Sequence, residues 1–372
     1  MKIVVAMDSF KGSLASDEAN RAVAAGLAGH ETVLLPLSDG GEGFLEPFRG
    51  GSFASRASTV GGPLGEPAEA EFLFSPAEGR AILESARCCG LGLVPEGRRD
   101  PLRASSAGLG ELVRSALDLG AREIVVGLGG SATCDCGMGM AAALGVRFLD
   151  EAGAELPPCG ANLARIRSVD PSGLDARLAR VRVVAACDVV NPLCGPTGSA
   201  LVYAPQKGAD ARAVALLESG ARNLATLLHR ALFADRSAEP GAGAAGGLGF
   251  ALRAFLDAEL VPGADLALRA VGLREALEGA SLLITGEGRY DAQTRFGKAP
   301  ARAAALARAR SVPTLLLCGG CDEPPADEPL FRVRRATPEG TPLALAMESE
   351  TARSNLERAA SEAVAEFARG TF

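Results

Sequence analysis

SLLITGEG at residues 281–288 and KIVVAMDS at residues 2–9 decide the fold class, and they lie at opposite ends of the chain. Each begins with a short apolar run typical of a strand and breaks at a turn or loop that carries a carboxylate. Apolar residues at helical spacing follow in 15–27 and in 299–309. Alternation of strands with helices is typical of α/β folds. We therefore predict an α/β protein in which both chain ends build one domain.

The middle of the chain has strands and helices of its own. REIVVGLGGSA at 122–132 predicts a strand that runs into a glycine-rich turn, and VRVVAAC at 181–187 predicts another strand. The length of 372 residues fits two domains at roughly 150 residues each. The predicted domains are 1–65 plus 281–372, and an inserted α/β domain over 66–280, with the active site in the cleft between them.

The composition excludes several classes of function. A net charge of −7, from 38 basic and 45 acidic side chains, makes the chain a poor partner for a nucleic-acid backbone. The aromatic content is 4% with no Trp, too little for base-stacking platforms. The N-terminal apolar run stops at Asp8, short of a signal-peptide core, and no run approaches a membrane span of roughly 20 residues. We expect a cytoplasmic protein without a membrane partner, and a homodimer stays open.

Nine cysteines at irregular spacing do not form the framework of a secreted disulfide protein, so reduced thiols are expected. Two pairs, Cys134 with Cys136 and Cys318 with Cys321, would supply four zinc ligands by number alone. The sequence after Cys321, DEPPADEP, does not start a regular helix as a redox CxxC does. Small buried or loop-lining thiols are the preferred interpretation.

Two glycine-rich segments are candidate phosphate loops. No Walker A loop is present, since Lys298 is followed by Ala rather than by Ser or Thr. GLGGSA at 127–132 lies between a predicted strand and a predicted helix, which favours a loop that faces a ligand. GAGAAG at 241–246 matches GxGxxG, but no strand leads into it. Its glycines either bring backbone N–H groups to a phosphate or pack closely, and both interpretations stay open.

Acidic residues after predicted strands are the main functional signal. They are Asp8, Asp39, Asp188 and the pair Glu287 and Asp291. In one open-sheet cleft such carboxylates bind magnesium and deprotonate a hydroxyl. Lys11, Lys207 and Lys298 lie in similar loops, and a cation on the transferred phosphate is the other requirement of phosphoryl transfer. The pattern indicates a kinase without a P-loop.

Eight motifs appear in a fixed order from Met1 to about Cys321. They are DSFKGSL, PLSDGGEGF, GGPLGEPAEAEF, GLGGSATCDCGMGMAAALG, CDVVNPLCGPTGSA, YAPQKGA, GAGAAGGLG and ITGEGRYDAQTRFGKAP. Together they resemble the bacterial glycerate kinase family of the two-domain α/β type. The resemblance implies an ATP- and Mg²⁺-dependent kinase of D-glycerate, with a Rossmann-like three-layer domain from both chain ends and an inserted α/β domain. Asn and Gly are common in the family where this chain has Cys134 and Cys136.

The motifs that match the family carry the expected site, while the resemblance leaves individual roles open. The catalytic candidates are Asp188, Asp291, Lys11 and Asp8, with Asp188 or Asp291 taking the hydroxyl proton and Lys11 steadying phosphate charge. The substrate-binding candidates are Asp39, Gly40, Gly41, Glu42, Arg289, Lys298 and Ser105. The ATP-binding candidates are Gly129, Gly130, Ser131, Asn191, Gln206, Lys207, Gly243, Gly246, Gly247 and Glu287. Asp39 and Asp188 are the expected Mg²⁺ ligands.

Alternatives remain at this point. The 2-hydroxyl of glycerate is favoured as the phosphate acceptor, and the 3-hydroxyl is the alternative. A nucleotide-linked oxidoreductase of a small hydroxy acid would use GAGAAG as its dinucleotide loop. A non-catalytic sensor of a sugar acid is disfavoured, because recognition of an anion alone would favour cations over the acidic loops.

Overall fold

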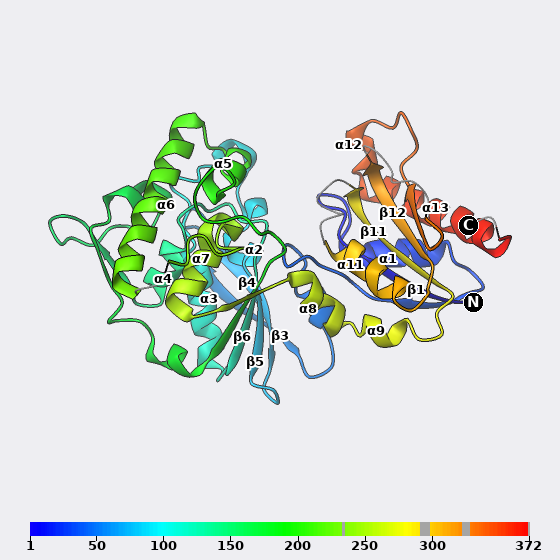
Figure 1. Cartoon of the computed structure of the whole chain (residues 1–372), viewed down its shortest axis with the longest axis horizontal. Coiled ribbons are helices and arrows are strands. Elements are labelled where there is room, and N and C mark those ends of the chain that lie inside the picture. Colours follow the sequence, from blue (N-terminus) through cyan, green and yellow to red (C-terminus); the bar gives the residue numbers. More distant parts are fainter. Residues whose placement is uncertain (233–234, 291–297, 322–327, 371–372) are drawn as a thin grey trace. The chain divides into compact units, whose positions relative to one another are not determined.

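The structure, a computed structural model, describes residues 1–232, 235–290, 298–321 and 328–370 (Figure 1). It divides into two compact units. Unit 1 comprises Met1–Asp39, Glu46–Phe48 and Gly263–Phe372, and unit 2 comprises Gly40–Leu45 and Arg49–Pro262. The colours of Figure 1 show the blue N-terminal segment and the orange-to-red C-terminal segment together in unit 1.

Unit 1 is built on a parallel sheet, whose strands within the described residues follow the order β13-β12-β11-β1-β2. The strands are β1 (Lys2–Met7), β2 (Glu31–Leu34), β11 (Leu282–Tyr290), β12 (Thr314–Cys321) and β13 (Phe331–Arg335). β1 and β11 come from the two ends of the chain and are direct neighbours, with Ile3 opposite Leu282. The predicted α/β class is confirmed.

Helices cover both faces of this sheet. Ile3 and Val5 of β1 share a core with α1 (Ser16–Ala25) and α13 (Ser349–Ala368). The alternate residue Val4 faces a second core, because successive side chains of a strand point to opposite faces. The second core includes residues of α8 (Gly263–Ala270), α9 (Leu273–Ala276) and α11 (Ala299–Arg308). A strand buried on both faces therefore reads as a continuous apolar run.

Unit 2 contains a mixed sheet with the order β10-β9-β6-β5-β4-β3. Its strands are β3 (Ala54–Gly61), β4 (Pro67–Ser75), β5 (Arg80–Glu84), β6 (Glu123–Gly127), β9 (Arg182–Ala186) and β10 (Glu259–Val261). The strands β5, β6, β9 and β10 are parallel, whereas β3 and β4 form an antiparallel hairpin. A small ribbon pairs β7 (Arg147–Leu149) with β8 (Ser168–Asp170).

The helices of unit 2 pack on this sheet and on each other. They are α2 (Ala86–Cys89), α3 (Ala107–Asp118), α4 (Met138–Ala143), α5 (Ser199–Tyr203), α6 (Ala211–Leu232) and α7 (Ala244–Leu256). Leu109 and Val113 of α3 share a core with Ile124 and Val126 of β6. Helix α4 is short, and Gly137 and Gly145 bracket it with positive φ angles. None of the helices within the described ranges has both the length and the hydropathy of a bilayer-spanning segment.

The unit boundaries differ from the predicted 65 and 281. The hairpin strand β3 pairs with β4 along its whole length, from Ala54 opposite Phe74 to Gly61 opposite Pro67. It therefore belongs to unit 2, and after Asp39 only the short segment Glu46–Phe48 belongs to unit 1 before the chain resumes there. At the other end, α8 and α9 contribute Leu268 and Leu273 to a core of unit 1. Unit 1 therefore resumes at Gly263.

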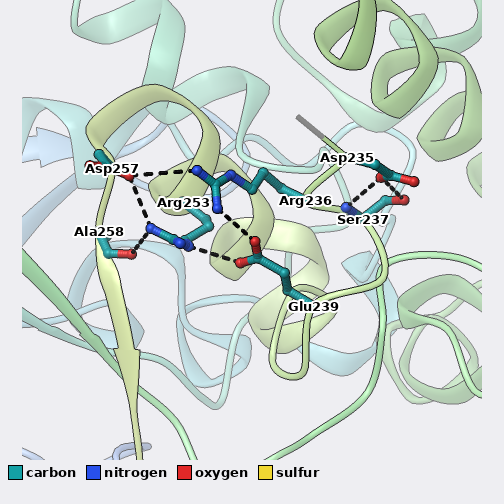
Figure 2. Close-up of polar contacts among 7 residues, drawn as sticks. All are labelled: Asp235, Arg236, Ser237, Glu239, Arg253, Asp257 and Ala258. Atoms are coloured by element: carbon teal, nitrogen blue, oxygen red, sulfur yellow. Dashed lines mark hydrogen bonds and ion pairs between the residues drawn. The ribbon is translucent and has the colours of Figure 1, made fainter. Parts of the chain in front are cut away.

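An ion-pair network fastens the segment before α7 to the end of that helix (Figure 2). Arg253 donates to Glu239 at 2.8 Å and to Asp257 at 3.0 Å. Arg236 donates to the other carboxylate oxygen of Glu239 at 2.8 Å. Between Arg236 and Glu239, the Ser237 carbonyl oxygen accepts the Leu193 N–H at 2.8 Å. The network thus fixes the entry into the glycine-rich start of α7.

Candidate active site

The carboxyl edge of the unit 1 sheet carries Asp8, Asp39 and Glu287. Asp8 follows β1 directly, and its N–H donates to the Gly286 carbonyl oxygen at 2.8 Å. The Asp8 side chain accepts the Ser9 N–H at 2.7 Å. Glu287 lies in the last part of β11, beside the same edge. Parallel strands end at one edge of a sheet, so these carboxylates lie where α/β sheets usually bind ligands.

These carboxylates line a cavity of about 640 Å³ together with Lys11 and Lys298. Lys11 Nζ lies 3.8 Å from Asp39 Oδ2, and Lys298 Nζ lies 3.3 Å from Glu287 Oε2. Burial raises the pKa of the Asp8 carboxyl well above its ordinary range, and the Asp39 carboxylate raises it further. The negative charge in this cavity disfavours ionisation of the Asp8 carboxyl. A bound cation would offset that charge.

The donor set of this cavity suits a magnesium ion that is also held by a phosphate. Mg²⁺ prefers oxygen ligands and is usually bound by one or two carboxylates together with substrate phosphates. No three His, Cys, Asp or Glu side chains of the described residues form a ready-made metal centre. Asp39 can supply one carboxylate ligand to such a phosphate-bound ion.

In unit 2, the loop after β6 packs on the backbone of Gly40 and Gly41. A Cβ at Gly129 would come within 2.6 Å of the Gly41 Cα. A Cβ at Gly40, where φ is +93°, would come within 2.7 Å of the Ala186 carbonyl oxygen. Both positions require glycine for close approach of two backbones. Glu42 follows as an exposed residue.

Lys207 is a buried lysine beside this loop, with 3% of its surface exposed. Its Nζ donates to Ser131 Oγ at 2.9 Å and to the Thr133 carbonyl oxygen at 2.8 Å. Burial of an ammonium group is costly unless the site uses its charge. Lys207 and the glycine loop at 129–131 therefore form a second candidate anion site, and the neighbouring Gln206 is exposed.

Asn191 fixes the loop that follows β9 and Asp188. Its Nδ2 donates to the Thr197 carbonyl oxygen at 2.7 Å, and its Oδ1 accepts the Tyr203 hydroxyl at 2.7 Å. Its carbonyl oxygen accepts the Gly243 N–H at 2.9 Å. Asp188 lies two residues beyond β9 and is partly buried. The structure therefore gives Asn191 a role in shaping the loop beside Asp188.

Asp135 is a fully buried carboxylate that the motif comparison did not single out. It accepts the N–H and the hydroxyl of Ser106, both at 2.8 Å, and the N–H groups of Gly137 and Gly139 at 3.1 and 3.0 Å. Burial raises the pKa of Asp135, while the hydrogen bonds from Ser106 oppose that rise. Asp135 thus ties the start of α3 to the start of α4. An Asp close to glycines predicts a turn. The sequence does not predict that its hydrogen-bond partner is Ser106, 29 residues away.

Comparison with known proteins identifies the family to which the chain belongs. A sequence model of the glycerate kinase family matches residues 3–368. The chain belongs to the glycerate kinase family. This membership confirms the expected family and the expected enzyme class, a phosphotransferase.

Relatives of the glycerate kinase family align over most of the chain. The glycerate kinase of Bacillus subtilis (strain 168) is 43% identical over 327 residues, which cover 86% of this chain and 85% of the relative. The glycerate 2-kinase of Escherichia coli (strain K12) is 41% identical over 324 residues, with 86% and 85% coverage. A crystal structure from Salmonella typhimurium LT2, of a candidate glycerate kinase 2, is 37% identical. It has a TM-score of 0.81 and covers 100% of this chain and 99% of that chain.

The unit 1 cavity gathers six of the site residues expected from the glycerate kinase motifs. They are Asp8, Lys11, Asp39, Glu287, Arg289 and Lys298. The motifs predicted that Glu287 binds ATP and that Arg289 and Lys298 bind glycerate. All three residues line the same cavity, so their positions do not separate the two ligands. Asp291 lies outside the described residues. The remaining expected residues lie in unit 2, where Ser105 Oγ accepts the Ala107 N–H at 3.3 Å at the start of α3.

Close packing accounts for the glycines of GAGAAG. A Cβ at Gly243 would clash with the Pro192 carbonyl oxygen, and one at Gly246 would clash with that of Thr133. A Cβ at Gly247 would come within 2.8 Å of the Cys136 Cα. No strand among the described residues leads into this segment, so it lacks the context of a dinucleotide loop. Phosphate contact at these glycines stays a prediction.

The two cysteine pairs are ordinary buried or strand residues. Cys318 and Cys321 lie in β12, so this CxxC does not open a helix. Cys134 and Cys136 are buried, and burial raises the pKa of both thiols. The described residues contain no cluster of metal-binding side chains that would hold zinc. The preferred sequence interpretation of small packed thiols agrees with this placement.

Proposed function

We propose that the protein transfers the γ-phosphoryl group of ATP to the 2-hydroxyl of D-glycerate. The observation that carries this proposal is the unit 1 cavity, where Asp8, Asp39 and Glu287 meet Lys11 and Lys298 at one strand edge. Phosphoryl transfer requires charge neutralisation at the phosphates and a carboxylate near the attacking oxygen. The family membership supports the same reaction class.

The residues have distinct roles in the proposed reaction. Lys11 and Lys298 would bind phosphate oxygens, and Asp39 would hold a magnesium ion, with Asp188 as the second expected ligand. Magnesium supplies positive charge that offsets the charge of the phosphates. Asp188 or Asp291 accepts the proton of the glycerate hydroxyl. Arg289 is the candidate partner of the glycerate carboxylate.

The position of phosphorylation is proposed from the relatives. One relative, from Escherichia coli, is named a glycerate 2-kinase, which favours 2-phosphoglycerate as the product. Two-dimensional ¹H–³¹P NMR of the product distinguishes the isomers, because the phosphorus couples to one methine proton in the 2-isomer. Coupling to a methylene pair instead would make the protein a 3-phosphoglycerate-forming kinase.

ADP release coupled to NADH oxidation tests the reaction itself. We expect turnover that depends on both D-glycerate and Mg²⁺, and a loss of about 100-fold or more in kcat/KM for Asp39→Asn. Asp118→Asn, an exposed residue of α3 in unit 2, is a matched control and should keep wild-type turnover. Near-normal turnover in both Asp188→Ala and Asp291→Ala would refute the assignment of the base.

The cysteines support the proposed cytoplasmic location. All nine lie in the described residues, and no disulfide joins any two of them. Most are buried, and burial raises the thiol pKa to about 12 at Cys187 and about 11 at Cys194. Reduced thiols of this kind are typical of proteins that stay in a reducing compartment.

A further inference from the structure

The unit 1 cavity has a second wall that the proposed chemistry of phosphate and glycerate does not use. It is apolar and comes from α12 (Leu343–Ala346) and the first turns of α13, with Leu343, Ala346, Met347, Ala352 and Leu356 among its residues. Leu343 is 75% exposed and Met347 is 40% exposed. Large apolar side chains that remain this exposed at a cavity indicate a surface that an apolar ligand group covers.

The cavity is larger than glycerate alone would fill. At no more than about 30 Å³ per non-hydrogen atom, the three-carbon acid would fill about a third of the 640 Å³. A nucleoside triphosphate has about four times as many non-hydrogen atoms, enough to fill the whole cavity on the same measure, and 640 Å³ lies in the roughly 300–1,000 Å³ range of ligand pockets. A small acid bound to the lysines would leave the apolar wall uncovered.

Two buried polar atoms of the lining lack a protein partner. Ser13 Oγ and Asn355 Nδ2 have no hydrogen-bond partner among the residues that the structure describes. Both residues line the cavity, and Asn355 lies on α13 beside Ala352 and Leu356 of the apolar wall. A buried polar atom without a partner is costly, so such atoms usually have a ligand or a water molecule as partner. An amide donor beside an apolar surface is the combination that a purine ring nitrogen needs.

The charged side of the same cavity suits a chain of phosphates. Lys298 is the N-cap residue of α11, and helix N-termini attract anions. Gly288 and Gly320 line the cavity, and a Cβ at Gly320 would meet no atom within 4 Å. Among the described residues, no atom occupies the place of a side chain at Gly320, so a phosphate can come close to the backbone there.

We propose that the unit 1 cavity is the purine-nucleotide site, with the base on the wall of α12 and α13 and the phosphates toward Lys11 and Lys298. Asn355 Nδ2 donates to a ring nitrogen of the base. The inference rests on the proposed kinase function, and it places the nucleotide in unit 1 rather than on the glycine loops of unit 2.

Isothermal titration calorimetry with Mg²⁺–ATP and with Mg²⁺–tripolyphosphate, in the absence of glycerate, separates the base from the phosphates. We expect Asn355→Leu and Leu343→Ala to weaken ATP binding about three- to tenfold and to leave tripolyphosphate binding unchanged. Leu345→Ala, on the same helix but outside the cavity lining, is the matched control and should bind both ligands like the wild type. Lys298→Ala should weaken both ligands.

Photolabelling with 2-azido-ATP locates the base independently of any variant. Trypsin cleaves after Arg335 and Arg353, so label on α12 appears in the peptide 336–353. Label confined to unit 2 peptides, wild-type ATP affinity in both wall variants, or no ATP binding by the wild-type protein would each overturn the proposal. ATP binding at this wall without glycerate turnover would refute the proposed acceptor and leave the nucleotide site standing.

Discussion

Asp135 accepts hydrogen bonds from four donors in a site that excludes water. An Asn side chain has one acceptor oxygen and one NH₂ group, so its NH₂ group would face donors and some of them would lose their acceptor. We therefore expect Asp135→Asn to lower the free energy of unfolding by about 2–3 kcal/mol. Urea unfolding followed by far-ultraviolet circular dichroism measures this change.

The control for Asp135 is an exposed carboxylate of the same unit. Asp118→Asn removes the 2.7 Å ion pair with Arg177, which lies on the surface. This substitution should change stability by less than about 1 kcal/mol. An equal effect of the two substitutions would show that the buried network around Asp135 contributes no more than a surface pair.

Residues at strand ends were predictable, whereas residues that act through long-range partners were not. Asp8 and Glu287 follow or end apolar runs that the sequence shows clearly, and the structure places both in one cavity. Lys207 was predicted as an ATP-binding residue, but its hydrogen bond to Ser131 joins residues 76 apart. The spacing of residues near Lys207 in the sequence does not indicate a contact with Ser131. The role of Asp135 was missed for the same reason.

At the scale of elements, the segment before α7 depends on one carboxylate with two arginine partners (Figure 2). Glu239 accepts hydrogen bonds at 2.8 Å from both Arg236 and Arg253. We expect Glu239→Gln to lower the free energy of unfolding by about 1–2 kcal/mol and to speed hydrogen exchange in 237–247. Glu362→Gln in the exposed pair with Arg358 should change stability by less than about 0.5 kcal/mol. Unchanged exchange in Glu239→Gln would contradict this role of the network.

The hairpin β3–β4 carries an ion pair that should make unit 2 sensitive to acid. Arg49 donates to both oxygens of Glu71, at 2.8 and 2.9 Å, and lowers the pKa of Glu71 from 4.5 to about 2. Because the folded pKa lies below the unfolded value, this contribution is complete above pH 4.5 and is lost as the pH falls toward 2. The stability difference between wild type and Glu71→Gln should therefore shrink between pH 7 and pH 3. A difference that is constant over this range would exclude the ion pair as its source.

At the scale of the whole molecule, the predicted α/β class and the family are confirmed, and the boundaries are not. The strand and helix patterns were readable because apolar periodicity is local. The structure divides the chain after Asp39 rather than at 65, because a hairpin's strands reveal their own pairing but not the sheet that they join. The α8–α9 segment lies in unit 1 rather than in the predicted inserted domain, and an amphipathic helix does not identify the sheet that it covers.

Unit 2 has its own sheet and cores, so we expect the fragment 40–262 to unfold in one cooperative transition. A fragment that starts at residue 49 lacks Phe44, whose ring occupies the space that a Cβ at Gly127 would need. It also lacks the Leu45 N–H that donates to Glu84. The shorter fragment should have a lower midpoint in thermal unfolding. Equal midpoints would show that 40–45 is dispensable for unit 2.

The pairing of β1 with β11 has a consequence for synthesis on the ribosome. The first strand leaves the exit tunnel early, but its neighbour at Leu282–Tyr290 is translated only after all of unit 2. Nascent chains therefore complete the middle of the protein while the N-terminal strand still lacks half of its hydrogen-bond partners. A chain that terminates before β11 lacks Glu287 and therefore cannot bring it to Asp8. Because the strands of unit 1 are translated at the two ends of the chain, incomplete translation products do not form the unit 1 cavity.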